Sequence, residues 1–256
     1  MLQNAPSLHV SLARTEDDLR AAQRLRYDVF VTELGGTGDG VDHARRLETD
    51  AFDAHADHLL LRDARRLDSD TDGVVGVYRL MTKDHAAAAG RFYSASEFDL
   101  SKLVSSGRTL LELGRSCLHP DHRGGAGLLA LWQGLAEYVA LRKIDLLFGT
   151  ASFHGTDQNR LIQPISHLHA VYLAPENLRV TARMPQTTAL LPPDRIDRKT
   201  AMRDTPALIK SYLKLGGMIG QGVYVDHAFN TTDVCLILET DRLDHASLRR
   251  MPRRDP

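Results

Sequence analysis

The feature that most constrains the fold is a strand, a glycine-rich turn, a helix and a second strand that follow one another without a break. Residues 109–118, TLLELGRSCL, predict the first strand, and residues 119–127, HPDHRGGAG, form the turn. Residues 128–143 have the length and composition of a helix, and the apolar run at 144–153 predicts the second strand. This unit would occupy the centre of the fold.

The residues before this unit predict a helix and a hairpin. Thr15 and the acidic residues after it have the pattern of a helix cap, and the helix is expected over residues 19–34. Two apolar runs, 58–64 and 73–82, are separated by a segment with the turn chemistry of a hairpin. The order helix, antiparallel strands, strand, turn, helix and strand is typical of the α+β class.

The last hundred residues are less regular. Residues 191–206 have the proline and charge content of a loop, residues 207–222 predict a helix stopped by a glycine pair, and residues 234–240 predict a strand. The basic, proline-broken tail at 245–256 is interpreted as a frayed terminus. We expect a single domain over residues 1–256, with a core at 1–153 and a C-terminal part at 154–256 that completes the sheet and the pocket.

Composition excludes several classes of protein. The 256 residues are 43% hydrophobic and 25% charged with a net charge of -1, which is ordinary for a globular enzyme and argues against a nucleic-acid binder. Only two cysteines occur, so we expect buried thiols and a reducing compartment instead of a disulfide framework. No window approaches the ~20 apolar residues of a membrane span. The expected location is the cytoplasm, or the inner membrane face as a peripheral protein.

The glycine-rich turn predicts an anion site. Backbone N–H groups and the positive end of the following helix would face an anion, and glycines allow its close approach. The turn residues expected to bind the phosphate of an acyl donor are His122, Arg123, Gly124, Gly125, Ala126 and Gly127.

Four short motifs in fixed order carry a family resemblance: LRYDVF at 25–30, ETDAFD at 48–53, VYRL at 77–80 and ELGRSCL at 112–118. Together they resemble the acyl-carrier-protein-dependent N-acyltransferases with a GNAT fold, which include enzymes that acylate ornithine and the acyl-homoserine-lactone synthases. The resemblance implies a central twisted mixed sheet, flanked by helices, that splays between its fourth and fifth strands. The turn fits the GNAT phosphate-binding signature, except that His122 stands where Arg or Gln is usual.

A second stretch, residues 207–239, resembles the terminal motif of the ornithine-lipid branch. The resemblance implies transfer of a 3-hydroxyacyl chain from acyl carrier protein to the α-amine of ornithine, giving a lyso-aminolipid. The implied partners are acyl carrier protein and an amino acid, with no bound cofactor beyond the phosphopantetheine thioester of the donor. Three alternatives remain open: glutamine as the amine, an acyl-homoserine-lactone synthase that uses S-adenosylmethionine, and a non-enzymatic acyl-carrier or lipid-binding protein.

Amide formation needs a neutral amine, a stabilised oxyanion and an oriented substrate. Glu112 interrupts an apolar strand and is our first candidate for the amine proton, with Glu48 second and His119 as a further acceptor; an ion pair with Arg115 or Arg79 is the structural alternative for Glu112. Arg115 has the fork suited to a substrate carboxylate. The substrate-binding residues implied by the resemblance are Arg26, Phe30, Asp50, Asp53 and Arg79. Phe30 has a core position as its alternative.

The remaining charged residues give weaker signals. The twelve histidines lack metal-like spacing, so no metal site is predicted. Basic residues on two predicted helices, in the segment RRLETD and in the hairpin would form a docking face for an acidic carrier protein, with an ordinary solvated surface as the alternative. These residues are Arg20, Arg24, Arg45, Arg46, Arg62, Arg65, Arg66 and Lys143.

Overall fold

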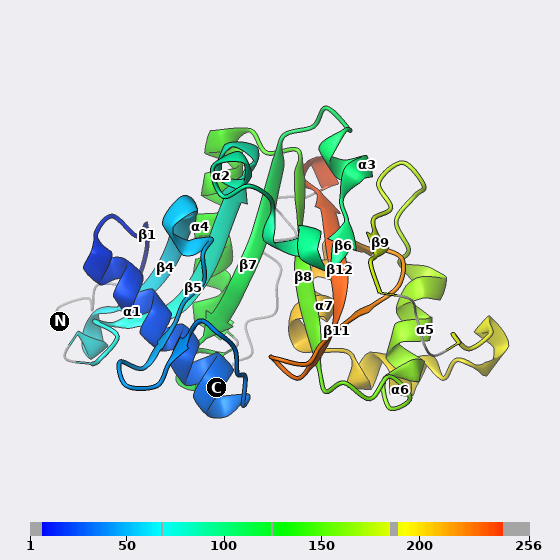
Figure 1. Cartoon of the computed structure of the whole chain (residues 1–256), viewed down its shortest axis with the longest axis horizontal. Coiled ribbons are helices and arrows are strands. Elements are labelled where there is room, and N and C mark those ends of the chain that lie inside the picture. The colour runs from blue at the N-terminus through cyan, green and yellow to red at the C-terminus, as the bar shows by residue number, and fades with distance from the viewer. Residues whose placement is uncertain (1–6, 68, 124, 185–188, 243–256) are drawn as a thin grey trace, which may run out of the picture. The chain divides into compact units, whose positions relative to one another are not determined.

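Figure 1 shows the computed structural model of the chain, which describes residues 7–67, 69–123, 125–184 and 189–242. The chain divides into two compact units. Unit 1 consists of the residues up to Ala89 and Leu113–Lys143, and unit 2 consists of Gly90–Glu112 and Ile144–Asp244. None of the helices in the described ranges combines the length and the apolar character that a membrane crossing requires.

Unit 1 is built around strands in the order β1-β4-β5-β7. Its strands are β1 (Leu8–Leu12), β2 (Val41–Asp42), β3 (Leu47–Glu48), β4 (Asp57–Asp63), β5 (Val74–Thr82) and most of β7 (Leu110–Leu118). Its helices are α1 (Glu16–Arg26), the π-helix η1 (Tyr27–Glu33), α2 (Lys83–Ala88), α4 (Gly125–Arg142) and the 3-10 helices η2 (Asp53–His55), η3 (Ala64–Arg66) and η5 (Pro120–His122). Strand β4 pairs antiparallel with both β1 and β5.

Helices α1 and α4 cover opposite faces of these strands (Figure 1). Helix α1 buries Ala22 and Leu25 in a cluster with Leu60 of β4. On the other face, α4 packs against the sheet at Gly134, where an added Cβ would be in ordinary contact with the Leu59 side chain at 3.6 Å. Since Leu59 and Leu60 are consecutive in a strand, their side chains point to opposite faces. The alternation of β4 therefore places one helix on each side.

Unit 2 contains the first residues of β7 together with β8, β12 and β10 in that order. Its strands are β6 (Phe98–Asp99), β8 (Leu146–His154), β9 (Thr181–Ala182), β10 (Met218–Ile219), β11 (Tyr224–Asp226) and β12 (Thr231–Glu239). Its helices are α3 (Ser101–Val104), α5 (Ile162–Val171), α6 (Arg198–Asp204), α7 (Ala207–Lys214) and the 3-10 helices η4 (Tyr93–Ser96), η6 (Pro193–Arg195) and η7 (Thr240–Arg242). Strand β8 pairs parallel with Leu110–Glu112 and antiparallel with β12, so the sheet is mixed.

The predicted cap of the first helix and the predicted hairpin are confirmed. Thr15 and Asp18 form the capping box at the start of α1, and the hairpin is β4–β5. The prediction of a loop over 191–206 is wrong for α6, because the Asp197 carboxylate caps it by accepting the N–H groups of Lys199 and Thr200. The predicted helix over 207–222 ends at Lys214, and Met218–Ile219 form strand β10.

The α+β class and the mixed sheet flanked by helices are confirmed. The single-domain division at residues 153 and 154 stays a prediction. The frayed tail predicted at 245–256 lies outside the described residues.

Candidate functional site

Six charged residues of unit 1 form a closed ring in which arginines and carboxylates alternate. Going around the ring, each residue contacts the next and the last contacts the first. We call this set the charge ring; its members, in order, are Arg26, Glu48, Arg115, Asp50, Arg79 and Asp53. All six were predicted as site residues from the motifs, and the structure brings them together.

The contacts of the ring are short and directional. Arg26 donates from Nε to Glu48 Oε2 and from Nη1 to Asp53 Oδ1, the latter at 2.7 Å. Arg115 donates from Nε to Glu48 Oε1 at 3.1 Å, and its Nη2 lies 2.9 Å from Asp50 Oδ2. Charge-assisted bonds of this kind are stronger than neutral ones and resist rearrangement. Glu48 is thus bonded to an arginine at each of its two oxygens.

The third arginine closes the ring. Arg79 donates from Nη1 to Asp50 Oδ1 at 2.6 Å and to Asp53 Oδ1 at 3.3 Å. Asp53 is further held through Oδ2 by the side-chain amide of Gln23 at 3.0 Å. Gln23 could not be predicted as a site residue from the sequence, because an isolated glutamine in a helix belongs to no motif. Its amide fixes the orientation of the Asp53 carboxylate.

The members of the charge ring differ in how far their side chains are buried. The side chains of Arg26 and Arg79 are 0% and 1% exposed, whereas those of Asp50 and Arg115 are 17% and 12% exposed. Burial alone would raise the pKa of Asp50, but the charges of Arg79 and Arg115 outweigh it and lower that pKa. Burial likewise opposes the charge on Arg26, and Glu48 and Asp53 outweigh it to raise the Arg26 pKa. The arginines thus favour the ionised form of Asp50, and the carboxylates favour the ionised form of Arg26.

The backbone of Arg115 is unusual. Its φ of 51° lies in the left-handed region although the residue is inside strand β7. A non-glycine residue in this region costs about 1–2 kcal/mol, so the surroundings must hold it there. The contacts of its guanidinium group with Glu48 and Asp50 supply that restraint. The sequence predicted an ordinary strand here and did not reveal this conformation.

Glu112 belongs to unit 2, where its carboxylate is bonded to backbone. The residue is 2% exposed, and its oxygens accept N–H groups from Tyr93 at 2.8 Å and Ser94 at 2.6 Å. The alternative from the sequence, an ion pair of Glu112 with Arg115 or Arg79, stays a prediction. Glu112 thus fixes the start of η4 to strand β7. Its role in catalysis stays a prediction.

From Ser94 a chain of hydroxyl groups leads to a second carboxylate. The Thr150 hydroxyl lies 3.1 Å from Ser94 Oγ and 3.0 Å from Glu97 Oε2. Glu97 is 3% exposed. Although a hydroxyl has one proton to donate, the short spacings tie β8 and η4 together beside Glu112. None of these three residues was singled out from the sequence.

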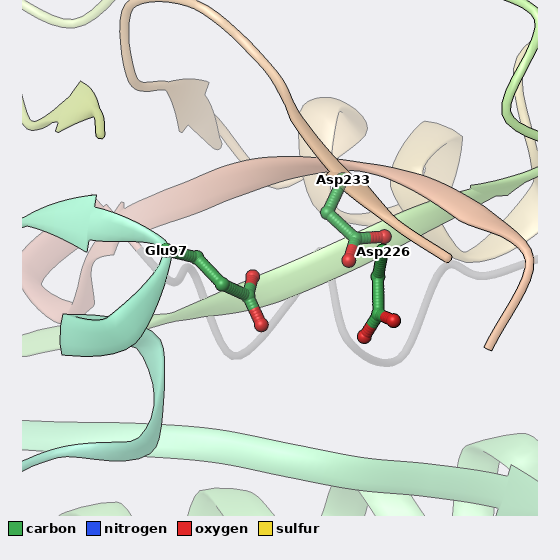
Figure 2. Close-up of side chains that lie close together, drawn as sticks. All are labelled: Glu97, Asp226 and Asp233. Carbon is green, nitrogen blue, oxygen red and sulfur yellow. The ribbon is translucent and has the colours of Figure 1, made fainter. Parts of the chain in front are cut away.

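Glu97 is one of three carboxylates that converge in unit 2 (Figure 2). One oxygen each of Glu97, Asp226 and Asp233 lies within 4.8 Å of the others, and Figure 2 shows the three groups coming from different segments of the ribbon. We call them the carboxylate cluster. In the described part of the chain it is the group whose geometry could hold a metal ion, and such carboxylates could equally attract an ammonium group. The sequence named Asp226 and Asp233 only as motif residues and did not name Glu97.

Replacing Asp226 with asparagine is expected to raise the melting temperature by a few degrees. Like charges at this spacing repel, and relief of about 1 kcal/mol shifts Tm by roughly 2–4 °C in a chain of this size. Asparagine keeps the oxygen that accepts the N–H groups of Ala228 and Phe229. The measurement is calorimetry without added divalent ions, with the exposed Asp194→Asn as the charge-matched control. A lower Tm in Asp226→Asn alone would contradict this repulsion.

The turn before α4 holds the residues predicted to bind the donor phosphate. His122 Nε2 lies 3.0 Å from Asp63 Oδ2, and the Arg123 guanidinium forms two bonds of 2.5 Å with Glu33. Gly124 lies outside the described residues. Gly125, at φ 55°, begins α4, and Ala126 and Gly127 complete its first residues. The helix start is where the sequence placed it, but the side chains of His122 and Arg123 are both engaged by carboxylates.

His119, the third candidate proton acceptor, is held by an arginine. Arg66 donates from Nη2 to His119 Nε2 at 3.0 Å, and an arginine can only donate. Nε2 of His119 is therefore unprotonated, and burial followed by the Arg66 charge lowers its pKa. To accept a proton from an amine, His119 would first have to release Arg66.

Phe30 was predicted to bind substrate, with a core position as the alternative. Phe30 is half-buried on η1 and packs against the core cluster of unit 1, in agreement with its alternative as a core residue.

Several arginines of the expected docking face pair with acids of the same unit: Arg20 with Glu16, Arg46 with Asp28, Arg62 with Asp18, Arg65 with Asp63 and Arg66 with Asp121. Docking an acidic partner would require exchange of these pairs.

The free energy of unfolding is expected to fall as the pH drops from about 7.5 to about 5.5. Burial lowers the pKa of His58, His119, His167 and His169 in the folded chain. Below the ordinary value of about 6.5, the unfolded chain therefore binds more protons than the folded chain, and acidification favours unfolding. Thermal melts across this range test the effect. A constant Tm would contradict it, because the carboxylates with lowered pKa titrate only at lower pH.

Comparisons with known proteins identify relatives of this chain. A family model described as an acetyltransferase (GNAT) domain matches residues 25–133. A Rhodobacter capsulatus protein named L-ornithine N(alpha)-acyltransferase is 54% identical over 237 residues, which cover 93% of this chain and 92% of that protein. A Brucella abortus protein of the same name is 39% identical over 93% of this chain and 86% of that protein.

Two solved structures support the fold alone. FeeM, an N-acyl amino acid synthase from uncultured soil microbes, matches with a TM-score of 0.55 at 10% identity and covers 93% of this chain and 95% of its own. The acyl-homoserine lactone synthase BjaI, solved with SAM and isopentyl-CoA, matches with a TM-score of 0.52 at 15% identity and covers 94% of this chain and 86% of its own.

Proposed function

Because the chain belongs to the family of L-ornithine N(alpha)-acyltransferases, we propose that it transfers a 3-hydroxyacyl chain from acyl carrier protein to the α-amine of L-ornithine. The enzyme class, an acyltransferase, follows from the family. The observation that carries the choice of ornithine is the 54% identity to the Rhodobacter capsulatus protein of that name, which extends over 93% of this chain. The product would be a lyso-ornithine lipid.

The proposed reaction is a direct transfer. The neutral α-amine attacks the thioester carbonyl, the carbon–sulfur bond breaks, and the carrier leaves as a thiolate. The nitrogen loses one proton as the amide forms, and the leaving sulfur takes up one proton to become a thiol. Cys117 is not needed as a covalent intermediate, and burial raises the pKa of its thiol to about 12, which makes it a poor nucleophile.

We assign the amine proton to Glu112 ahead of the other candidates. Both oxygens of Glu48 are bonded to arginines, and His119 Nε2 accepts from Arg66. Glu112 instead accepts the backbone N–H groups of Tyr93 and Ser94, and these bonds hold its carboxylate in one orientation. An oriented carboxylate in a nearly water-free position has the character of a general base.

The charge ring is proposed to orient substrate from its more exposed side. Asp50 and Arg115 are the members that solvent reaches, and an arginine fork is suited to a carboxylate such as that of an amino acid. Arg26, Asp53 and Arg79 would act by holding these two in place. The phosphate of the donor is assigned to the turn before α4, where backbone N–H groups begin a helix of eighteen residues.

The test is an assay of the purified chain with separate donors and amines. We expect acylation of ornithine by 3-hydroxyacyl carrier protein, and slower acylation by the same chain on CoA. Glutamine and S-adenosylmethionine serve as the alternative amines. Preferential acylation of glutamine, or release of a lactone from S-adenosylmethionine, would contradict the proposed substrate. Equal or faster rates with acyl-CoA would contradict the proposed donor.

A further inference from the structure

Asp63 is a buried carboxylate that the proposed reaction does not use. It is the last residue of β4, it is 1% exposed, and it lies beside the turn that precedes α4. Arg65 donates to it three times: from its backbone N–H at 3.0 Å, from Nε at 3.0 Å and from Nη2 at 2.8 Å. The hydrogen bonds from Arg65, although opposed by burial, hold the Asp63 pKa well below its usual range. Asp63 is therefore an ionised acceptor of fixed orientation.

The fourth contact of Asp63 is with Nε2 of His122. An ionised carboxylate can only accept, so Nε2 of His122 must carry the proton that bridges the 3.0 Å to Asp63 Oδ2. The other ring nitrogen, Nδ1, is buried and has no hydrogen-bond partner in the described part of the chain. Because Nε2 is directed at Asp63 and Nδ1 is buried, neither ring nitrogen is exposed to bind a phosphate.

The backbone of His122 is held from the opposite side. A Cβ added to Gly127 would lie 2.5 Å from the His122 carbonyl oxygen, so the glycine allows the turn to pack directly on the first turn of α4. The N–H of His122 also donates to the carbonyl of His119 at 2.8 Å, and the N–H of His119 donates to Val75 of β5 at 2.8 Å. The path of the turn is thus fixed by its backbone at these points and by Asp63 through the His122 ring.

We propose that Asp63 is a positioning residue for the acyl donor: through His122 it holds the turn in the shape in which its backbone N–H groups bind the donor phosphate. This inference rests on the proposed function, which places the phosphopantetheine group at this turn. It differs from direct recognition of phosphate by the residue at position 122, because Nε2 of His122 is bonded to Asp63 and Nδ1 is buried. The expected ligand chemistry is a phosphate monoester or diester at the end of a pantetheine arm.

The test compares two ligands that differ only in the phosphate. Calorimetry measures the dissociation constants of phosphopantetheine and pantetheine for the purified chain. The wild-type chain is expected to prefer phosphopantetheine. Asp63→Asn and His122→Leu are each expected to weaken phosphopantetheine binding about tenfold, the scale of a lost hydrogen bond to a charged group, and to leave pantetheine binding within about twofold.

Two further variants separate positioning from general damage. In His122→Gln the side-chain amide can still donate to Asp63, so this variant should restore most of the preference for phosphopantetheine. The double variant Asp63→Asn/His122→Leu should bind no more weakly than either single variant, because both changes remove the same contact. Asp17→Asn, whose side chain is 93% exposed on the first turn of α1, is the charge-matched control and should bind like the wild type.

Several outcomes would overturn the inference. They are equal weakening of both ligands, unchanged phosphopantetheine binding in Asp63→Asn and His122→Leu, or losses that multiply in the double variant. If Asp63→Asn does not fold, the comparison of His122→Leu with His122→Gln decides alone. Failure of the proposed function appears elsewhere: the wild-type chain would then bind phosphopantetheine normally but would not acylate ornithine.

Discussion

Replacing Arg26 with methionine is expected to destabilise the chain by about 3–5 kcal/mol. Arg26 is 0% exposed and contacts both Glu48 and Asp53, so its removal leaves two buried carboxylates with one cationic neighbour fewer. Removing one partner of a buried ion pair costs this much because the remaining charge stays uncompensated in the interior. Methionine fills a similar volume without the charge. Urea unfolding at pH 7 measures the difference in the free energy of unfolding.

Arg20 provides the matched control for this substitution. It lies on the same helix, its side chain is 53% exposed, and it pairs with Glu16 on the surface. Arg20→Met is expected to cost about 0.5 kcal/mol or less, because exposed ion pairs contribute little. Adding Asp53→Asn to Arg26→Met should recover part of the loss by removing one unpaired charge. Similar small losses for Arg20→Met and Arg26→Met would contradict the structural role of the charge ring.

Replacing Glu112 with glutamine is expected to lower turnover about 10²-fold or more. The substitution removes the negative charge and the basicity of the carboxylate while retaining one oxygen that can accept an N–H group. The two oxygens of Glu112 accept the N–H groups of Tyr93 and Ser94. In the variant one of these oxygens becomes an NH2 group, which faces a backbone N–H and cannot accept it. We expect a loss of about 1–3 kcal/mol in stability, which leaves the chain folded.

Turnover and melting temperature measured on the same preparation separate the two effects. Glu137→Gln, an exposed position on α4, is the control for loss of a carboxylate and should leave both quantities unchanged. Near-normal turnover in a folded Glu112→Gln variant would remove Glu112 from the catalytic assignment. The next candidates would be Glu48 and His119, each of which would then have to be released from an arginine.

The parts of the fold that could be predicted from sequence are those encoded by neighbouring residues. Thr15 and Asp18 lie within one helical turn, so neighbouring residues determine where α1 begins. The strands of β4 and β5 follow from apolar runs and an intervening turn. The π-helix after Arg26 could not be predicted, since its residues have ordinary helical composition and its hydrogen-bonding pattern depends on packing.

The candidate site was predicted as a set of residues but not as an arrangement. Motifs named all six members of the charge ring, yet nothing in the sequence shows that Glu48 bridges Arg26 and Arg115. Such pairings depend on how β3, β7 and α1 pack. Glu97 was missed for the same reason, because it reaches Asp226 and Asp233 only after strands distant in sequence come together.

The most direct test of the account is mass spectrometry of lipid extracts from cells that express the chain. The account predicts a new lipid in which ornithine carries one amide-linked 3-hydroxyacyl chain on its α-nitrogen, and predicts that expression of the Glu112→Gln variant reduces it strongly. Fragmentation of the head group identifies the amino acid and the acylated nitrogen. A glutamine head group, acylation on the side-chain nitrogen, or no new lipid from well-expressed, folded chain would contradict the account.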